Sequence, residues 1–386
     1  MRPTPLQALP VERLRERSSA KWRTYPDDVL PLFVAETDFP LAPAIERALL
    51  HAVRIGDTGY TPPEAGLGRA YADFAERRFG WRPDATRIRS TCDVMMALVE
   101  VLRAVIRPGD RVVVTPPVYP PFFDGVPEAG GIVESVPLRD TGEAWELDID
   151  AIDRAFAGGA RAIVLCNPHN PTGTVHSRSA LAALAASAAR HGAVVISDEI
   201  HAPLAAPGAG FAPFLSVSAD AAEVGFALVS ASKAFNLAGL KCALMLAASD
   251  AHAAVLRALP DEVQWRTGHF GLLASLAAFA PESDAWLDSL LAALDENRRL
   301  LAALLAEHLP AAGYRMPDAG FLAWVDVSAY GWGDNPAVRI RRDARVALHH
   351  GPLFGEGGAG HVRLNIGTSP AILTEAVQRI GALATR

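Results

Sequence analysis

The chain has 386 residues, half of them apolar, and a formal net charge of −7. This size predicts about two to three domains, or one large α/β domain with a smaller partner, around a sizeable core. The acidic balance argues against a nucleic-acid or anionic-membrane partner. The three cysteines show no ligand-like spacing, so we expect no metal site, no disulfide and a reducing cytoplasmic location.

Signals for export or membrane insertion are weak in this sequence. The N-terminal residues include arginines but no apolar stretch of the kind found in secretion signals. No window approaches the roughly 18 uninterrupted apolar residues that span a bilayer. We therefore expect a chain that is neither secreted nor inserted in a membrane.

The first 80 residues combine an irregular segment with two helical patterns. Repeated prolines predict that residues 1–40 are irregular, and a helix is predicted from Pro43 to Arg54 with proline in its first turn. A loop at 56–63 then precedes an amphipathic helix predicted from Leu67 to Phe79.

The middle of the chain alternates short β-branched runs with helical patterns. A strand at Ile88–Thr91 is followed by a helix from Val94 to Ile106, with Asp93 as its N-cap. The clearest later helical pattern runs from Ser179 to His191. The later strand candidates are Arg111–Val114, Gly131–Val133, Ala162–Leu165, Val194–Ile196, Phe226–Val229 and Ala243–Leu246. This alternation predicts an α/β fold, with a mostly parallel sheet covered by helices on both faces.

A change in composition near residue 280 indicates a smaller α+β unit. A long helix is predicted from Asp284 to Leu309, and a C-terminal helix from Pro370 to Ala384. Short strands are predicted around Phe321–Val327 and His361–Leu364. The predicted domains are 1–45, an N-terminal arm and part of the small domain; 46–280, the large domain; and 281–386, the small domain.

Distinctive side chains follow four of the predicted strands in turn. They are an aromatic, Tyr119, an amide, Asn170, a carboxylate, Asp198, and an amine, Lys233. Because ligands of open α/β sheets bind at the carboxyl ends of the strands, we expect these side chains to meet in one site.

Lys233 is one of only three lysines in the chain, with Lys21 and Lys241. A lysine between small hydroxyl residues at a strand end can bind phosphate, or can form an imine with a carbonyl cofactor such as pyridoxal phosphate. A solvated surface lysine is the alternative interpretation of Lys233.

Other residues of the set suit a pyridoxal phosphate site. Asp198 can keep the ring nitrogen protonated, Asn170 can donate to the phenolic oxygen, and Tyr119 can stack on the ring. Ser230, Ser232 and Lys241 can bind the phosphate, aided by the helix start near Val94. Taken singly, each has a structural alternative: a turn for Asn170, packing for Tyr119 and a turn cap for Asp198.

Three motifs in series give the chain a recognisable signature. They are the segments 167–173 (NPHNPTG), 197–201 (SDEIH) and 230–240 (SASKAFNLAGL). They resemble the class I/II aminotransferase superfamily of pyridoxal phosphate enzymes with fold type I. The resemblance runs from about Leu30 to the C-terminus and implies that fold, with this cofactor.

Further motifs resemble the cystathionine β-lyase branch typified by MalY and PatB. They are Lys21-Trp22-Arg23, the segment 30–40 (LPLFVAETDFP), Gly59-Tyr60, and His201 three residues after Asp198. Many aminotransferases have tyrosine in place of His201. The branch implies a C–S lyase.

The resemblance implies a role for each cofactor-binding residue. Lys233 would hold the cofactor as an imine and move the proton at the substrate Cα. Asp198 would pair with the pyridine nitrogen, while Asn170 would bind the phenolic oxygen with His201 nearby. Tyr119 would stack on the ring and count, with Lys233, among the catalytic residues.

The remaining implied roles concern the phosphate, the substrate and the partner subunit. Ser230 and Lys241 would hold the phosphate, with backbone amides around Val94. Tyr60 would reach the phosphate in the neighbouring subunit of a homodimer and so take part in catalysis. Arg363 would clamp the substrate α-carboxylate as a bidentate fork, close to Asn170.

The sequence departs from the family pattern at four positions. Asp93 stands where small neutral residues are expected, and it would repel a phosphate unless it caps its own helix. Lys241 replaces the arginine of many relatives. Phe33 and Thr37 stand where Trp and Met are common, which predicts a different substrate entrance.

The leading functional hypothesis is β-elimination from an S-substituted L-cysteine such as cystathionine, giving a thiol, pyruvate and ammonia. The alternative is an aminotransferase that acts on an L-amino acid and a 2-oxo acid with the same residues. A pyridoxal-phosphate-sensing transcription regulator would need a DNA-binding extension that the first 40 residues are too short to supply. A cofactor-free binding protein is the remaining class.

Overall fold

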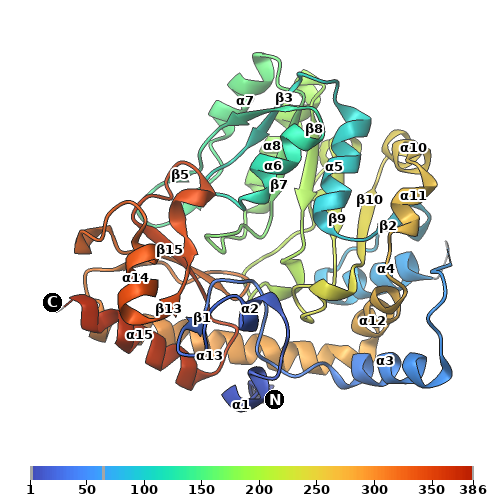
Figure 1. Ribbon diagram of the computed structural model, residues 1–386. Helices are drawn as coiled ribbons and strands as arrows, with labels where there is room; N and C mark the ends of the chain where they lie inside the picture. The colour runs from blue at the N-terminus through green and yellow to red at the C-terminus, as the bar shows by residue number, and fades with distance from the viewer. Residues whose placement is uncertain (1–2, 63–65, 385–386) are drawn as a thin grey trace.

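A computed structural model describes residues 3–62 and 66–384 of the chain (Figure 1). The last residue of the loop predicted at 56–63 lies outside these ranges. Two sheets of different size are joined by helices, and the N-terminal segment lies against the smaller one (Figure 1). No helix in the described ranges is both long and apolar enough to cross a membrane.

The large sheet has seven strands in the part of the chain that the structure describes. Their spatial order is β2 (Ile88–Thr91), β10 (Ala243–Ala247), β9 (Gly225–Val229), β8 (Val194–Asp198), β7 (Ala162–Cys166), β3 (Arg111–Val114) and β4 (Ile132–Ser135). The strands β9, β8, β7, β3 and β4 are parallel, whereas β10 is antiparallel to both of its neighbours. The predicted mostly parallel α/β sheet is confirmed.

Helices cover both faces of this sheet because side chains alternate along each buried strand. On β3, for example, Val113 packs into one hydrophobic cluster, while Val112 and Val114 pack into the other. One face is covered by α5 (Val94–Val105), α6 (Pro121–Glu128), α10 (Asp250–Ala258) and α11 (Asp261–Trp265). The other is covered by α4 (Leu67–Phe79), α7 (Ile149–Ala157), α8 (Arg178–His191), α9 (Ala219–Val224) and α12 (His269–Phe279), and α3 (Pro43–Ile55) packs against α12.

The small sheet is antiparallel and is built from the last quarter of the chain. Its order is β11 (Gly313–Tyr314), β12 (Leu322–Asp326), β15 (His361–Asn365) and β14 (His349–His350). Its helices are α13 (Asp284–His308), α14 (Pro336–Ala344) and α15 (Pro370–Ala384). A separate two-stranded ribbon pairs β5 (Arg139–Asp140) with β6 (Trp145–Glu146).

The N-terminal segment contains more regular structure than the prolines predict. It forms the short helices α1 (Val11–Leu14) and α2 (Ala20–Arg23), and β1 (Leu30–Pro31) pairs in parallel with β13 (Val346–Ala347). The expectation that residues 1–40 are irregular is therefore wrong in part, because elements of two to four residues tolerate nearby prolines. The division into 1–45, 46–280 and 281–386 stays a prediction.

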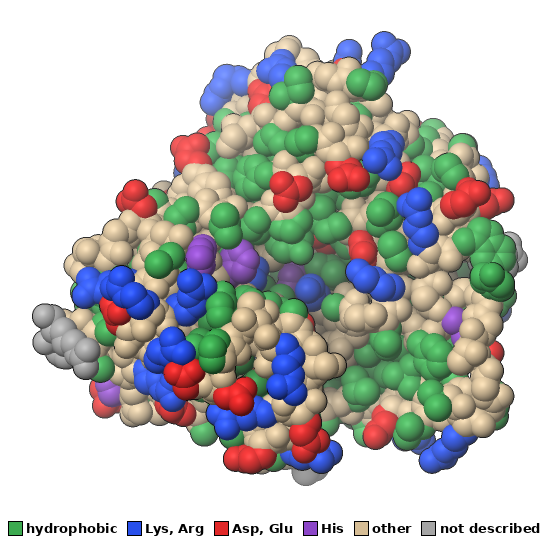
Figure 2. Space-filling view, viewed as in Figure 1, with side chains coloured by type: hydrophobic (Ala, Val, Ile, Leu, Met, Phe, Trp, Pro, Cys, Tyr) green, Lys and Arg blue, Asp and Glu red, His purple; other side chains and the backbone are tan. Residues whose placement is uncertain are grey.

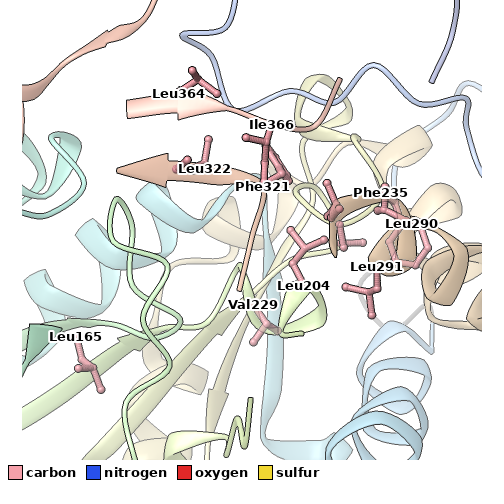
Figure 3. Packing of buried hydrophobic residues seen from close by; sticks show 14 of the residues in the cluster. Leu165, Leu204, Val229, Phe235, Leu290, Leu291, Phe321, Leu322, Leu364 and Ile366 are labelled. Atoms are coloured by element: carbon pink, nitrogen blue, oxygen red, sulfur yellow. The ribbon is translucent and has the colours of Figure 1, made fainter. Parts of the chain in front are cut away.

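Buried apolar side chains connect the two sheets. Figure 3 shows Phe235, from the loop after β9, beside Leu204, Phe321 and Leu290. All four are fully buried members of one cluster that also contains the side chains on one face of the large sheet. This shared core holds the small sheet above the carboxyl ends of the large one.

Candidate active site

A pocket of about 570 Å³ lies where the loops after β3, β7, β8 and β9 meet β15 of the small sheet. Figure 2 shows a hollow at the centre of the molecular face, with basic and histidine side chains inside it. The predicted site residues that line it are Asp93, Val94, Tyr119, Asn170, Asp198, His201, Ser230, Ser232, Lys233, Lys241 and Arg363. The expected convergence of the strand-end loops is therefore observed.

Lys233 lies at the wall of this pocket with few partners for its amine. Its Nζ donates to the Ala35 carbonyl oxygen at 3.4 Å, a long hydrogen bond. Burial and, to a smaller extent, the charge of Arg363 lower the pKa of Lys233 to about 8, while the charge of Asp198 opposes the shift. Lys233 is therefore not a solvated surface lysine, and its amine can lose its proton near physiological pH.

Asp198 ends β8 on the floor of the pocket. Its Oδ1 accepts from the Ile200 amide at 3.0 Å, so the carboxylate also caps the following turn. Burial raises the pKa of Asp198 to about 7, although the Ile200 amide and Lys233 oppose this. A protonated ring nitrogen beside this carboxyl would favour its ionised form, as the sequence predicts.

Arg363 reaches the pocket from β15 and is buried there, 4% exposed. It donates from Nη1 to Asn170 Oδ1 at 3.0 Å and from Nη2 to the Phe33 carbonyl at 3.1 Å. Burial lowers the pKa of Arg363 to about 10, which leaves it cationic at neutral pH. A guanidinium has five N–H donors, so three remain for a carboxylate after these two bonds.

The start of α5 forms the end of the pocket that suits an anion. Asp93 caps this helix, with Oδ1 accepting from the Met96 amide at 2.8 Å. Asp93 thus meets the condition stated for a phosphate site, that it caps its own helix. Its Oδ2 also pairs with Lys241 Nζ at 3.0 Å. A helix N-terminus beside a lysine favours phosphate binding.

Ser230 and Ser232, in the loop that contains Lys233, make different contacts at this end of the pocket. Ser230 Oγ donates to the Cys242 carbonyl at 2.7 Å and accepts from the Ser232 amide at 3.1 Å. A phosphate contact from Ser230 would require the bond to Cys242 to break. Ser232 lines the pocket as well.

His201 and Tyr119 complete the walls. The His201 Nδ1 is buried and has no hydrogen-bond partner among the described residues. Burial lowers the pKa of His201 to about 3, so its ring is neutral. Burial raises the pKa of Tyr119, whose ring packs edge-on against Phe122 with centroids 5.6 Å apart.

These groups fit a phosphorylated pyridine aldehyde. The pocket offers an amine of lowered pKa, a buried carboxyl, an unpartnered imidazole nitrogen and a helix start for an anion. An unpartnered buried nitrogen such as that of His201 is costly unless a ligand or water satisfies it. The residues present therefore suit the cofactor that the sequence predicts.

Tyr60 is the one predicted site residue that does not line the pocket. It is 91% exposed, and its ring packs edge-on against Trp265 with centroids 6.2 Å apart. The next residue is held by a hydrogen bond from Thr61 Oγ1 to the Thr267 carbonyl at 3.0 Å. A single chain therefore presents Tyr60 to solvent.

His349 lines the pocket and was not predicted from the sequence. It lies directly opposite Arg363 across the β14–β15 pair, which places both side chains on one face of the sheet. Burial and the charge of Arg363 lower the pKa of His349 to about 3. No local motif marks this histidine, because its position depends on strand register.

Cysteines also line the pocket without forming a recognisable motif. Cys92, Cys166 and Cys242 all contribute to its walls. All three are free thiols. The odd number and irregular spacing gave no signal that they would meet around one cavity.

Residues 36–380 match the family described as Aminotransferase class I and II. The chain belongs to this family. Among its relatives, a Mycobacterium tuberculosis protein with the provisional name cystathionine beta-lyase is 46% identical over 407 residues, covering 98% of each chain. The cystathionine beta-lyase of Corynebacterium glutamicum is 35% identical, covering 97% of this chain and 98% of its own.

Solved structures agree with this place in the class I and II aminotransferase family. A Corynebacterium diphtheriae protein, provisionally described as a PLP-dependent beta-cystathionase, superimposes with a TM-score of 0.94. It is 33% identical, and the match covers 99% of both chains. The predicted fold type and the predicted cystathionine β-lyase branch are confirmed.

Proposed function

We propose that this protein cleaves the carbon–sulfur bond of an S-substituted L-cysteine, such as cystathionine, with pyridoxal 5'-phosphate as cofactor. The reaction consumes water and yields a thiol, pyruvate and ammonia. The observation that carries this proposal is the similarity along the whole chain to relatives named as cystathionine beta-lyases. The pocket around Lys233 supports it with the groups that such a cofactor requires.

Each part of the cofactor has a matching group in the pocket. When bound, the cofactor supplies an electron sink that stabilises negative charge at the substrate Cα. Lys233 would hold it covalently, and Asp198 would keep its ring nitrogen protonated. Asn170 and His201 would lie near the phenolic oxygen, and Tyr119 would stack on the ring. The phosphate would lie at the start of α5, with the side chains of Ser230, Ser232 and Lys241 and the backbone of Val94 around it.

The chain's own groups position the substrate and move its proton. The donors left on Arg363 would bind the α-carboxylate and fix the orientation of Cα. The Lys233 amine, with its pKa near 8, would take the proton from Cα and is near the optimum for proton transfer at neutral pH. The Cβ–S bond can then break, with the electron pair leaving on sulfur.

An aminotransferase remains the second candidate because the matching family is described as Aminotransferase class I and II. An LL-diaminopimelate aminotransferase from Desulforudis audaxviator is also 30% identical, covering 92% of this chain. Both reactions would use Lys233 to remove the Cα proton. In the lyase reaction the sulfur substituent leaves Cβ, whereas in the aminotransferase reaction the amino group is transferred to a 2-oxo acid.

The two candidates are separated by following products in parallel. Purified protein would be given cystathionine and other cysteine S-conjugates, and thiol, pyruvate and amine transfer to a 2-oxo acid would be measured. The proposal expects equal amounts of thiol and pyruvate at a rate above that of amine transfer. Amine transfer without thiol release would favour the second candidate.

We further propose a homodimer in the cytoplasm, with Tyr60 reaching the partner's cofactor phosphate. Support comes from the exposure of Tyr60 and of three apolar residues on α3, Leu50, Val53 and Ile55, which are 46%, 62% and 61% exposed. Figure 2 shows hydrophobic side chains gathered over the region of α3 and α12. Exposed apolar patches of this kind mark interfaces.

Complementation tests the shared site. Dimers of Lys233→Ala and dimers of Tyr60→Ala should each be inactive. Co-expression should recover about a quarter of the wild-type activity, since half of the dimers are mixed and each holds one intact site. Recovery that stays at the level of the separate variants would contradict the role of Tyr60 across the interface.

A further inference from the structure

Side chains, rather than a sheet or helix, hold the segment Phe33–Thr37, which we call the strap. Each of its five carbonyl oxygens accepts a hydrogen bond from a side chain. The donors are Arg363 to Phe33, Asn365 to Val34, Lys233 to Ala35, Asn365 and Lys21 to Glu36, and Arg17 and Asn236 to Thr37. Five consecutive carbonyls held in this way fix the path of the main chain.

The strap forms part of the active-site wall. Its residues Phe33, Val34 and Ala35 line the pocket. Two of the donors, Lys233 and Arg363, are the proposed catalytic and carboxylate-binding residues. The shape of the strap therefore sets where these two side chains find their acceptors.

A buried ion pair anchors the strap at its end. Asp38 follows it directly and accepts from Lys21 Nζ at 2.7 Å and from Trp22 Nε1 at 3.1 Å. Lys21 and Asp38 are 1% and 0% exposed, and Trp22 is 8% exposed. The Asp38 amide also donates to the Gly367 carbonyl at 2.8 Å, which ties the anchor to the chain after β15. Both oxygens of the carboxylate are thus used.

Two sequence motifs meet at this anchor. Lys21 and Trp22 belong to one of the segments that resemble the cystathionine β-lyase branch, and Asp38 belongs to another. Neither segment contributes Lys21, Trp22 or Asp38 to the pocket lining. The proposed reaction leaves these three residues without an assigned part.

We propose that Lys21, Trp22 and Asp38 are positioning residues, which hold the strap so that its Phe33 carbonyl orients Arg363. The kinetic part of this proposal rests on the proposed function. The structural part, that the anchor orders the strap, does not. Arg363 is the side chain that depends most on an ordered strap, because the Phe33 carbonyl and Asn170 Oδ1 together fix the plane of its guanidinium.

The effect of a weaker anchor on KM and kcat depends on whether Arg363 binds the substrate in the ground state, in the transition state or in both. Arg363 would bind the substrate carboxylate both before and during the reaction. An interaction that is equal in the ground state and the transition state affects KM and leaves kcat nearly unchanged. A weakened anchor should therefore raise KM selectively.

Trp22→Phe is the most informative variant, because it keeps an aromatic ring at this position and removes the Nε1–H donor to Asp38. Its matched control is Trp332→Phe, since Trp332 is also 8% exposed and does not line the pocket. With the cofactor-loaded protein and an S-substituted cysteine, W22F should raise KM about five- to tenfold, which corresponds to the loss of one hydrogen bond. The kcat of W22F and both constants of W332F should stay within about twofold of wild type.

A second readout does not depend on activity. Hydrogen–deuterium exchange of the loaded protein without substrate should be faster in W22F at the strap, including the amides of Thr37 and Asp38, which bond to Asn236 and Gly367. The W332F protein should exchange at the wild-type rate there. If W22F does not fold, Lys21→Arg replaces it, because it keeps the charge beside Asp38 and alters the geometry toward the Glu36 carbonyl.

The outcomes separate this proposal from the proposed function. Unchanged exchange at the strap, or faster exchange with an unchanged KM, would overturn the positioning role. A fall in kcat without a change in KM would overturn it as well. Wild-type protein that releases neither thiol nor pyruvate would instead refute the proposed function, and faster exchange in W22F would still support the anchor.

Discussion

Two of the three lysines are enclosed by protein, and they differ in what surrounds the amine. Lys21 has a carboxylate oxygen of Asp38 at 2.7 Å and the Glu36 carbonyl at 3.2 Å. Lys233 faces the pocket, and within residues 3–62 and 66–384 its amine has only the Ala35 carbonyl, at 3.4 Å, as a hydrogen-bond partner. Burial lowers the pKa of both amines, but at Lys21 the paired carboxylate opposes the shift more directly.

This difference separates a structural lysine from a reactive one. A buried charge that is paired and hydrogen-bonded stabilises its surroundings and is expensive to disturb. A poorly partnered amine in a low-dielectric site loses its proton readily and becomes a nucleophile and base. The sequence distinguishes the two only through their neighbours along the chain, whereas the structure does so through distances.

The largest expected effect is on catalysis, at Lys233. Lys233→Ala should reduce pyruvate release from a cysteine S-conjugate by about a thousandfold or more, because both the covalent link and the base are lost. Circular dichroism should show an unchanged fold. A K233A protein with more than a tenth of the wild-type rate would refute the reactive role of this lysine.

The next effect is on stability, at Lys21. Lys21→Met removes the closer of the two cations at the buried Asp38, since Arg17 Nη1 stays 3.9 Å from Asp38 Oδ1. The free energy of unfolding should therefore fall by about 2–3 kcal/mol in urea titrations, the loss of one hydrogen-bonded charge pair. The double variant Lys21→Met with Asp38→Leu removes both charges and should recover more than half of that loss. A K21M protein as stable as wild type would mean that the ion pair is not structural.

A smaller effect is expected on substrate binding, at Arg363. Arg363→Lys keeps the charge but loses the planar fork, so KM should rise about 10- to 100-fold with a smaller change in kcat. Arg342→Lys on the surface, whose side chain is 71% exposed, is the matched control and should leave both constants unchanged. An R363K protein with wild-type KM would place the carboxylate elsewhere.

The smallest effect concerns the pH at which the apoprotein takes up pyridoxal phosphate. Only the neutral amine of Lys233 reacts, so the rate of colour formation should rise with pH and level off above its pKa of about 8. Because the charge of Asp198 raises this pKa, Asp198→Asn should move the midpoint to lower pH. A midpoint near that of free lysine, with no response to D198N, would contradict the environment described for the amine.

Most elements of the fold follow from local patterns. The helix Leu67–Phe79 and the strand Ile88–Thr91 have the predicted bounds, because apolar spacing and capping residues mark them. The direction of β10 was not predicted, since apolar runs carry no information on strand direction. The absence of an α-helix between β9 and β10 in the described chain was an available signal, because parallel neighbours need a long crossover.

The active site also contains some residues that local patterns predict and others that they do not. The strand-end residues Tyr119, Asn170, Asp198 and Lys233 could be predicted, because parallel strands bring their carboxyl ends to one edge. His349 and the anchor of Lys21 and Asp38 could not be predicted from spacing. Their positions depend on register and on side-chain bonds between segments that are distant in the sequence.

The most direct test of the central claim asks which lysine carries the cofactor. Protein loaded with pyridoxal phosphate would be reduced with borohydride and digested, and the cofactor mass would be located among the peptides of Lys21, Lys233 and Lys241. We predict a single modified peptide, the one that contains Lys233. Modification of Lys21 or Lys241 with Lys233 unmodified, or no modification at all, would contradict the account.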